Sequence, residues 1–172
     1  MLQLRMRAPY HVLFLCTGNS ARSILAESIL REKAGDRFVA HSAGSRPAGR
    51  VHPRVLAWLR QRGLPIDGLR SKNWDEFARP DVPALDLVIT VCDNAAGEVC
   101  PVWPGRPTTA HWGMPDPAAA EGDAAIDRKI AEVAQALSAR IGLLASLPFD
   151  KLDRLSLQSR LREIGRSAAT TA

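Results

Sequence analysis

Apolar residues in this chain follow two patterns, short continuous runs and stretches in which they recur every three or four positions. Residues 10–15 and 85–91 are largely apolar, which is typical of strands buried on both faces of a parallel sheet. Two further strands are expected at residues 37–44 and 108–112. Helical spacing predicts helices at residues 24–35, 51–62 and 124–144, and Ser71 or Asn73 is expected to cap a brief helix near residues 75–77.

The order of these elements predicts the fold class. Strands that alternate with helices are typical of an α/β layer sandwich with one parallel sheet and right-handed crossovers. Ligands of such sheets bind beyond the carboxyl ends of the strands. Cys16 and Cys92 each come directly after a predicted strand, so we expect both thiols at that edge of the sheet.

The end of the chain has a different character. From residue 148 on, leucines and isoleucines are spaced among basic residues, which predicts one more amphipathic helix. We therefore divide the chain into a domain at residues 1–147 and a C-terminal helical extension at residues 148–172. Residues 167–172 are expected to fray.

Composition and charge narrow the function classes. The chain has 172 residues, a net charge of +5 and an isoelectric point near 9.6. That charge suits small anions, but it is too modest and dispersed to indicate a nucleic-acid partner. No apolar run is long enough to span a membrane and residues 1–7 lack the apolar core of a secretory signal, so the expected compartment is the cytoplasm. Three cysteines make no disulfide framework, and their thiols are expected to be reduced there.

The strongest chemical signal is the loop between the first strand and the first helix, with the sequence Cys16-Thr17-Gly18-Asn19-Ser20-Ala21-Arg22-Ser23. A strand, a tight loop and a helix N-terminus direct backbone N–H groups and the helix dipole at one point, which binds an oxyanion without a metal. Arg22 adds a planar guanidinium that can form two parallel hydrogen bonds to such an anion. We expect these groups to lower the pKa of Cys16 into a reactive range of roughly 3.5–7.5.

Each candidate residue also has a structural interpretation. A cysteine at the end of a strand is commonly a small buried apolar residue. Asp116 lies between two prolines and would serve as a turn cap as readily as a general acid. Cys92 and Cys100 flank a flexible segment and are either redox-active or inert. Zinc held by these cysteines with His41 or His111 is disfavoured, because zinc sites need four ligands and usually a closer cysteine spacing.

Three stretches taken together carry a family resemblance. They are the Cys16 loop, residues 91–101 with the sequence VCDNAAGEVCP, and residues 111–117 with the sequence HWGMPDP. In these stretches the chain resembles the arsenate reductases built on the low-molecular-weight protein tyrosine phosphatase fold. The resemblance covers residues 10 to about 147. It implies a three-layer sandwich with a four-stranded parallel sheet.

The resemblance also implies the roles of the three thiols and the acid. Cys16 resembles the nucleophile that attacks arsenate, and Asp116 resembles the acid that protonates the departing oxygen. Cys92 resembles the thiol that attacks the Cys16–arsenic adduct, releases arsenite and leaves a Cys16–Cys92 disulfide. Cys100 is similar to the thiol that takes over this disulfide as Cys92–Cys100. If residues 93–98 are helical in the reduced protein, Cys92 and Cys100 lie too far apart to bond, so we expect this segment to refold in each turnover.

Binding groups and partners follow from the same resemblance. The oxyanion cradle is implied to comprise Arg22 and the loop residues Thr17, Gly18, Asn19, Ser20, Ala21 and Ser23, of which Ser23 also stabilises the thiolate. Phosphate and sulfate are expected to bind as analogues of arsenate. No bound cofactor or metal is implied to take part in the chemistry. The electrons come from an external thiol reductant, which is either thioredoxin or a glutathione–glutaredoxin system.

A cation position behind the loop is a further expectation. Some members of the family hold a potassium ion there, on groups that resemble Asn19, Glu27 and Ser42. Lys72 is expected to pass close by. Its ammonium is predicted to stand in for the ion and to pair with Glu27, the alternative being a solvated surface lysine.

Two other functions stay open at this stage. A phosphatase would hydrolyse phosphate monoesters with Cys16, Arg22 and Asp116 alone. Residues 118–120 are alanines where phosphatases of this fold usually carry tyrosines, which argues against selectivity for aryl phosphates. A non-enzymatic thiol sensor would instead bind arsenite or an oxyanion through the three cysteines.

Overall fold

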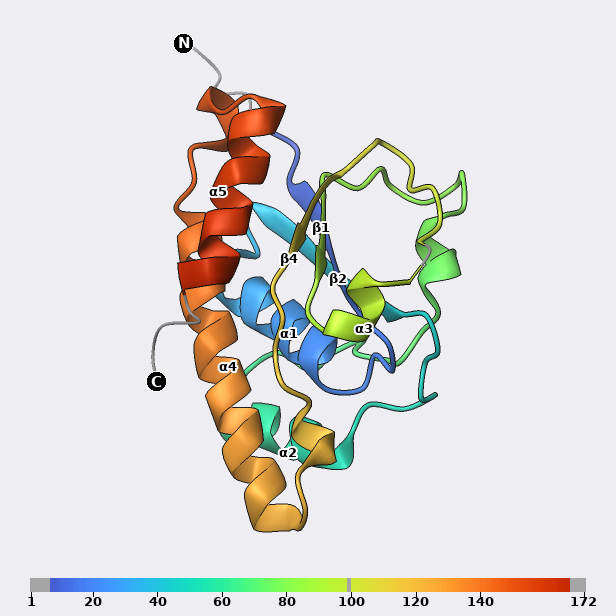
Figure 1. Cartoon of the computed structure of the whole chain (residues 1–172), viewed down its shortest axis with the longest axis vertical. Coiled ribbons are helices and arrows are strands. Elements are labelled where there is room, and N and C mark those ends of the chain that lie inside the picture. Colours follow the sequence, from blue (N-terminus) through green and yellow to red (C-terminus); the bar gives the residue numbers. More distant parts are fainter. Residues whose placement is uncertain (1–6, 99, 168–172) are drawn as a thin grey trace.

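A computed structural model, which describes residues 7–98 and 100–167, contains the predicted four-stranded parallel sheet (Figure 1). The strands are β1 (Tyr10–Cys16), β2 (Phe38–Gly44), β3 (Leu87–Thr90) and β4 (Thr108–His111). Their order in the sheet is β2-β1-β3-β4, and β1 pairs with both β2 and β3. This inner position explains why β1 has the most continuous apolar run and why its end, Cys16, is buried.

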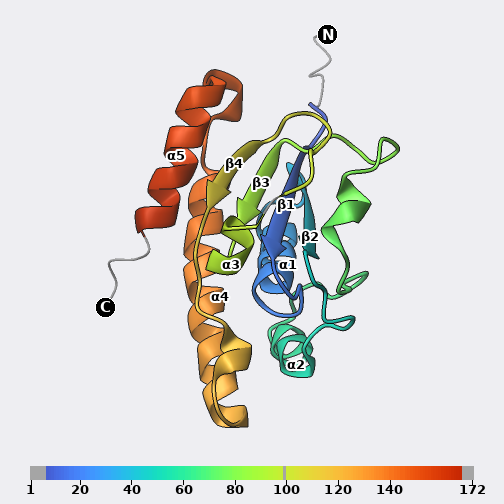
Figure 2. The same ribbon diagram turned by 45° about the vertical axis from the view of Figure 1, so that its right-hand side comes forward.

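Helices cover one face of the sheet. α1 (Arg22–Ala34) packs on β1 and β2 and against the long helix α4 (Asp123–Ala145). α2 (Pro53–Gln61) touches both of these helices, and α5 (Arg154–Ser167) lies along β4 (Figure 2). Val12 and Phe14 of β1 point into the larger core, which these helices share.

The opposite face of the sheet carries a smaller core. Leu13 and Leu15 of β1 pack there with Trp74 and Trp103. Trp74 begins the 3-10 helix η1 (Trp74–Phe77), which is capped by the side chain of Asn73, as one of the two predicted caps. The remaining short elements are α3 (Asp93–Ala96), η2 (Pro117–Ala119) and η3 (Phe149–Lys151).

The C-terminal helix is joined to the rest of the core. Leu161 and Ile164 of α5 belong to the larger apolar cluster, and the indole Nε1 of Trp112 donates to the Leu161 carbonyl at 2.9 Å. Residues 168–172, where fraying was expected, lie outside the described residues. Within the described ranges, no helix has the length and apolar character needed to cross a membrane.

Candidate active site

The loop after β1 is held from outside by the segment that follows β2. Three loop carbonyls accept hydrogen bonds of 2.9–3.0 Å from backbone N–H groups of that segment, in the pairs Thr17–Arg46, Gly18–Ala48 and Ser20–His52. The described peptide bonds are all trans, so each outward carbonyl turns the N–H of the next residue inward. The N–H of Asn19 donates to Cys16 Sγ at 3.2 Å, in agreement with this geometry. The loop therefore directs backbone donors toward the thiol.

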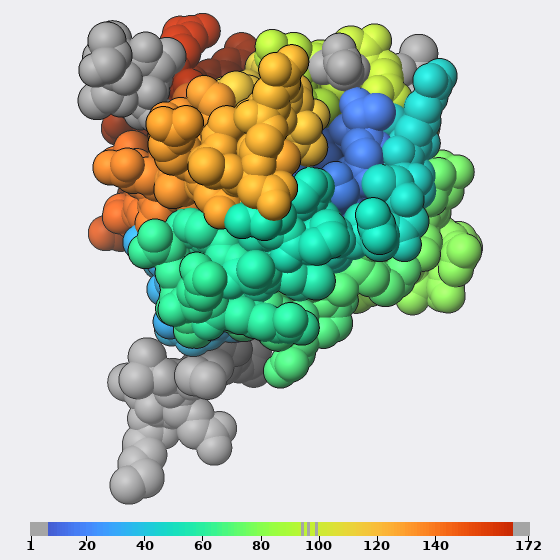
Figure 3. Space-filling view, turned by 90° about the horizontal axis from the view of Figure 1, so that it is seen from below, coloured from blue at the N-terminus to red at the C-terminus, as the bar shows by residue number. Residues whose placement is uncertain are grey.

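The close approach of the two segments depends on Gly44, the last residue of β2. A Cβ atom at this position would lie 2.4 Å from the Thr17 carbonyl oxygen and 2.9 Å from that of Cys16. Both atoms belong to the backbone, so a side chain at position 44 would push the loop away from the sheet. In the surface view, the blue atoms of the loop region lie between the cyan and teal segment that follows β2 and the orange start of α4 (Figure 3).

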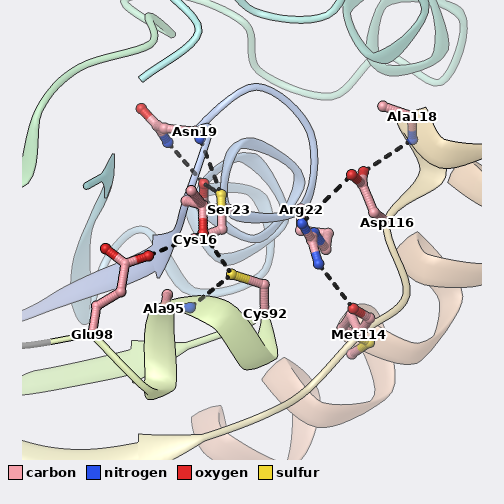
Figure 4. A network of polar contacts seen from close by, with 11 residues as sticks. Cys16, Asn19, Arg22, Ser23, Cys92, Ala95, Glu98, Met114, Asp116 and Ala118 are labelled. Carbon is pink, nitrogen blue, oxygen red and sulfur yellow. Dashed lines mark hydrogen bonds and ion pairs between the residues drawn. The ribbon is translucent and has the colours of Figure 1, made fainter. Parts of the chain in front are cut away.

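The Ser23 hydroxyl lies within hydrogen-bonding distance of the Cys16 thiol. The side-chain oxygen of Asn19 accepts from the backbone N–H of Lys72 at 2.9 Å, which fixes the orientation of the amide. Its Nδ2 then donates to Ser23 Oγ at 2.8 Å. Ser23 Oγ lies 2.8 Å from Cys16 Sγ and is free to donate to it (Figure 4). The Ser23 hydroxyl thus lies beside the thiol and is oriented by Asn19, which sequence analysis had assigned only to the cradle and the cation position.

Burial acts against these donors. The Cys16 side chain is 2% exposed, and this burial raises the pKa of its thiol, whereas the hydrogen bonds from Ser23 and Asn19 lower it. The predicted fall in the pKa below its usual range is therefore wrong for this structure. A thiolate loses its hydration at such a depth, and here the loss outweighs the donors.

Arg22 and Asp116 approach each other at the opening of the loop. Arg22 Nη1 donates to the Met114 carbonyl at 3.1 Å, and its Nη2 lies 3.7 Å from Asp116 Oδ2. The other carboxylate oxygen of Asp116 accepts from the N–H of Ala118 at 3.0 Å and so caps η2. Asp116 therefore does cap a turn, and the same cap holds its second oxygen beside Arg22.

Sequence analysis missed a second arginine, which contacts the loop that carries Asp116. Arg140 of α4 is 4% exposed, and its Nη1 lies 3.4 Å from the Gly113 carbonyl oxygen and 3.8 Å from Met114 Sδ. Burial lowers the pKa of its guanidinium. The available signal was a basic residue between Leu137 and Ile141 on the apolar stripe of a long helix. Two arginines therefore hold the loop that carries Asp116.

Cys92 lies beside the oxyanion loop, whereas Cys100 lies outside it. Cys92 is 1% exposed, and its Sγ is 3.6 Å from Thr17 Oγ1 and 3.4 Å from the N–H of Ala95. Cys100 is exposed, and all three cysteines are free. The helix between the two thiols, α3, covers Asp93–Ala96 and so is shorter than the segment expected to refold. The structure thus brings Cys16 and Cys92 to the same edge of the sheet, as predicted.

Three more polar contacts lie around α3, and none of them was predicted. The Thr17 hydroxyl donates to Glu98 Oε1 at 3.3 Å. His111 Nε2 donates to Asp93 Oδ1 at 2.8 Å, and its Nδ1 lies 2.7 Å from Thr90 Oγ1.

In the part of the chain that the structure describes, no cluster of three or more His, Cys, Asp or Glu residues is arranged to hold a metal ion.

Lys72 is buried behind the oxyanion loop. Its Nζ donates to the Ser42 carbonyl at 2.7 Å and lies 3.5 Å from Ser42 Oγ, which itself donates to Glu27 Oε2 at 2.7 Å. Burial lowers the pKa of Lys72 and raises that of Glu27, and their mutual attraction opposes both shifts. The ammonium is thus connected to Glu27 through the Ser42 hydroxyl, so the alternative of a solvated surface lysine is wrong.

Comparison with known proteins places this geometry in a family. Residues 11–154 match the family Low molecular weight phosphotyrosine protein phosphatase. The arsenate reductase of Bacillus licheniformis is 39% identical over 112 residues, which are 64% of this chain and 76% of the relative. The solved arsenate reductase of Archaeoglobus fulgidus is 31% identical, with a TM-score of 0.56 over 76% of this chain and 98% of that one. The thioredoxin-dependent arsenate reductase of Corynebacterium glutamicum is 31% identical, with a TM-score of 0.54 over 75% of this chain and 58% of that one.

The predicted resemblance to arsenate reductases of this fold is therefore confirmed, and the family match extends over most of the chain. The chain belongs to the low molecular weight phosphotyrosine protein phosphatase family.

Proposed function

We propose that this protein reduces arsenate to arsenite. The observation that carries the proposal is the second thiol, because Cys92 is buried within hydrogen-bonding distance of Thr17 in the oxyanion loop. A phosphatase with the same loop requires Cys16, Arg22 and Asp116 but has no use for a second thiol at this place. The names of the relatives support the same activity.

In the first step, Cys16 Sγ attacks the arsenic atom of arsenate. A sulfur–arsenic bond forms and an arsenic–oxygen bond breaks, with Asp116 giving a proton to the departing oxygen. Backbone N–H groups of the loop and Arg22 hold the remaining oxygens. Arsenic is still pentavalent in this adduct.

In the second step, the Cys92 thiolate attacks Cys16 Sγ. The disulfide forms while the sulfur–arsenic bond breaks, and the electron pair of that bond stays on arsenic. Arsenic becomes trivalent and leaves as arsenite, and the two thiols together are oxidised by two electrons.

In the third step, the Cys100 thiolate attacks Cys92 Sγ and Cys16 leaves as a thiolate. The disulfide then joins Cys92 and Cys100, and Cys100 is already exposed in the reduced protein. We infer that a dithiol protein of the thioredoxin type, or a glutathione–glutaredoxin system, reduces this bond. The dependence of the Corynebacterium glutamicum relative on thioredoxin supports the first of these reductants.

The buried ammonium of Lys72 completes the proposal. We infer that it replaces a potassium ion behind the loop, because its Nζ contacts Ser42, one of the groups that the family resemblance implies for the ion. Wild-type rates in sodium and in potassium buffers of equal ionic strength should agree within about twofold. Lys72→Gln should acquire a potassium dependence, and a strong requirement for potassium in the wild type would contradict the idea.

The proposed reduction is tested by assaying arsenate reduction and aryl phosphate hydrolysis side by side on the purified protein. Cys92→Ser should stop arsenite production and leave hydrolysis, where present, largely intact. Hydrolysis without any arsenite production in the wild type would favour a phosphatase, and arsenite binding without turnover would favour a sensor.

A further inference from the structure

The Thr17 hydroxyl connects Cys92 with a carboxylate that the three steps above do not use. Thr17 Oγ1 lies 3.6 Å from Cys92 Sγ and 3.3 Å from Glu98 Oε1. Figure 4 shows Glu98 directed toward the oxyanion loop from the end of the segment that begins at Cys92. A thiol, a hydroxyl and a carboxylate thus form a continuous row.

The chemistry of the three groups fixes the direction of these hydrogen bonds. A carboxylate can only accept, so the single proton of the Thr17 hydroxyl is donated to Glu98. The lone pairs of Thr17 Oγ1 are then available to accept the thiol proton of Cys92. The row therefore runs from donor to acceptor in one direction, from Cys92 through Thr17 to Glu98.

Cys92 needs such a path because it must lose its proton in order to attack Cys16. Its side chain is 1% exposed, so water has almost no direct access. In the described structure two groups lie within hydrogen-bonding distance of its sulfur, the backbone N–H of Ala95 and the Thr17 hydroxyl. An N–H cannot accept a proton, which leaves Thr17. Glu98, at the far end of the row, is partly exposed and can pass the proton to solvent.

We propose that Glu98, acting through Thr17, accepts the proton of Cys92 during the second step of arsenate reduction. As Cys92 Sγ bonds to Cys16 Sγ, the Cys92 proton moves to Thr17 Oγ1 and the Thr17 proton moves to Glu98. The carboxylate becomes a carboxylic acid and later releases its proton to water. The electron pair of the sulfur–arsenic bond goes to arsenic as before, so the proton transfer changes no oxidation state. This inference rests on the proposed function.

The other titratable groups at this site are the thiols of Cys16 and Cys100 and two carboxylates, Asp93, which accepts from His111, and Asp116, which lies beside Arg22. Electrostatic coupling links Cys92 to Cys16, and links Glu98 to Cys100, whose pKa is raised by burial and by the Glu98 charge. Cys16 is engaged with arsenic during the second step and Cys100 acts in the third. Of these groups, Glu98 is the one that the Thr17 hydroxyl connects to Cys92 in the described structure.

The test is a single turnover of the fully reduced protein with arsenate and no reductant, in which arsenite release is followed. At about pH 7, Glu98→Gln should release arsenite roughly 10²-fold more slowly, the lower end of what a positioned base contributes. The deficit should shrink as the pH is raised to about 9, because hydroxide ion then increasingly replaces Glu98 as the base that accepts the proton. Glu163→Gln, which removes the same charge from the outer helix α5, is the matched control.

A second pair of variants changes Thr17 and tests the same proton path, so a folding defect caused by a change at position 98 would not affect the result. Thr17→Val should slow release as Glu98→Gln does, and Thr17→Ser, which keeps the hydroxyl, should restore most of the rate. Wild-type release by Glu98→Gln at about pH 7, or a deficit that is the same at every pH, would overturn the inference. A wild-type protein that forms no arsenite would instead overturn the proposed function itself.

Discussion

The oxyanion loop and the segment of the second and third thiols adjoin each other, but the loop is fixed by hydrogen bonds and burial, whereas much of the segment is exposed. The loop is tied to the chain after β2 by three backbone hydrogen bonds, and Asn19 and Ser23 inside it are fully buried. The thiol segment has a four-residue helix, an exposed Cys100 and a Val102 that is 92% exposed. Binding an oxyanion requires donors that are already in position, whereas passing on a disulfide requires a thiol that can move. The difference therefore matches the division of work proposed for the two regions.

The largest expected effect is the loss of the nucleophile in the rigid region. Cys16→Ser should abolish arsenate turnover, because a serine hydroxyl here has no base to remove its proton. Arsenite production from arsenate with a thiol reductant is the measurement. Cys100→Ser is the contrasting variant in the other region, and it should release one arsenite per protein and then stop. Turnover by Cys16→Ser within about tenfold of the wild type would refute the role of Cys16.

The next effect tests how closely the loop must fit the sheet. Gly44→Ala places a methyl group against two backbone oxygens, so we expect a loss of roughly 2–4 kcal/mol in the free energy of unfolding and weaker binding of phosphate. Urea unfolding and phosphate titration measure the two quantities. Gly142→Ala is the control, since that position in α4 has open space and alanine there should stabilise by about 0.5–1 kcal/mol. Equal stabilities for the two variants would mean that the loop adapts.

The segment of the second and third thiols is tested by amide hydrogen exchange on the reduced and the oxidised protein. Cys92 and Cys100 can bond only with their Cα atoms within about 7 Å, so the buried Cys92 has to move toward the exposed Cys100, and α3, which follows Cys92 directly, is expected to move with it. Protection should therefore differ most between residues 93 and 102, while the amides of β1 stay unchanged. Equal protection of α3 in a sample shown to contain the Cys92–Cys100 bond would rule the refolding out.

The smallest effect concerns the strand that supports the rigid loop. His41 of β2 lies with its Nε2 3.0 Å from Nδ1 of His11, and burial lowers the pKa of His41 to about 4. In the unfolded chain a histidine takes up a proton near pH 6.5, whereas the folded protein resists this down to about pH 4. The free energy of unfolding that His41 contributes above pH 6.5 is therefore lost as the pH falls toward 4.

His41→Gln should remove about 1–2 kcal/mol of this loss, less than the full shift implies, because the ring is partly exposed. Urea unfolding between pH 7 and about pH 4 measures it. An unchanged slope in the variant would show that other groups cause the acid sensitivity.

Local sequence predicted the fold and the oxyanion loop because the relevant residues are neighbours in the chain. β1, the loop and α1 follow one another, so their order and spacing could be recognised locally, although the bonds from residues 46–52 that hold the loop could not. The stripe of α4 was predicted for the same reason. The ends of the elements differ from the predicted ones by one or two residues, for example at α2, which the side chain of His52 caps.

Contacts between distant segments could not be predicted. The contact of Glu98 with Thr17 joins residues 81 positions apart, and that of Arg140 with Gly113 joins residues 27 apart. The direction of the Cys16 pKa shift was missed because it depends on burial, which several elements create together. Lys72 was expected near Glu27 only through the family resemblance, and its connection through Ser42 was seen only in the structure.

The pairing of the loop with the chain after β2 also limits where insertions can occur. His52 donates its backbone N–H to Ser20, and its imidazole Nδ1 accepts from the N–H of Arg54 at the start of α2. An added residue between positions 46 and 52 would displace one of these bonds relative to the others, and with it either the loop or the first turn of α2. The number of residues in this connection is therefore set by the active site, and changes in chain length should be accommodated elsewhere, as at the exposed turn around Gly68.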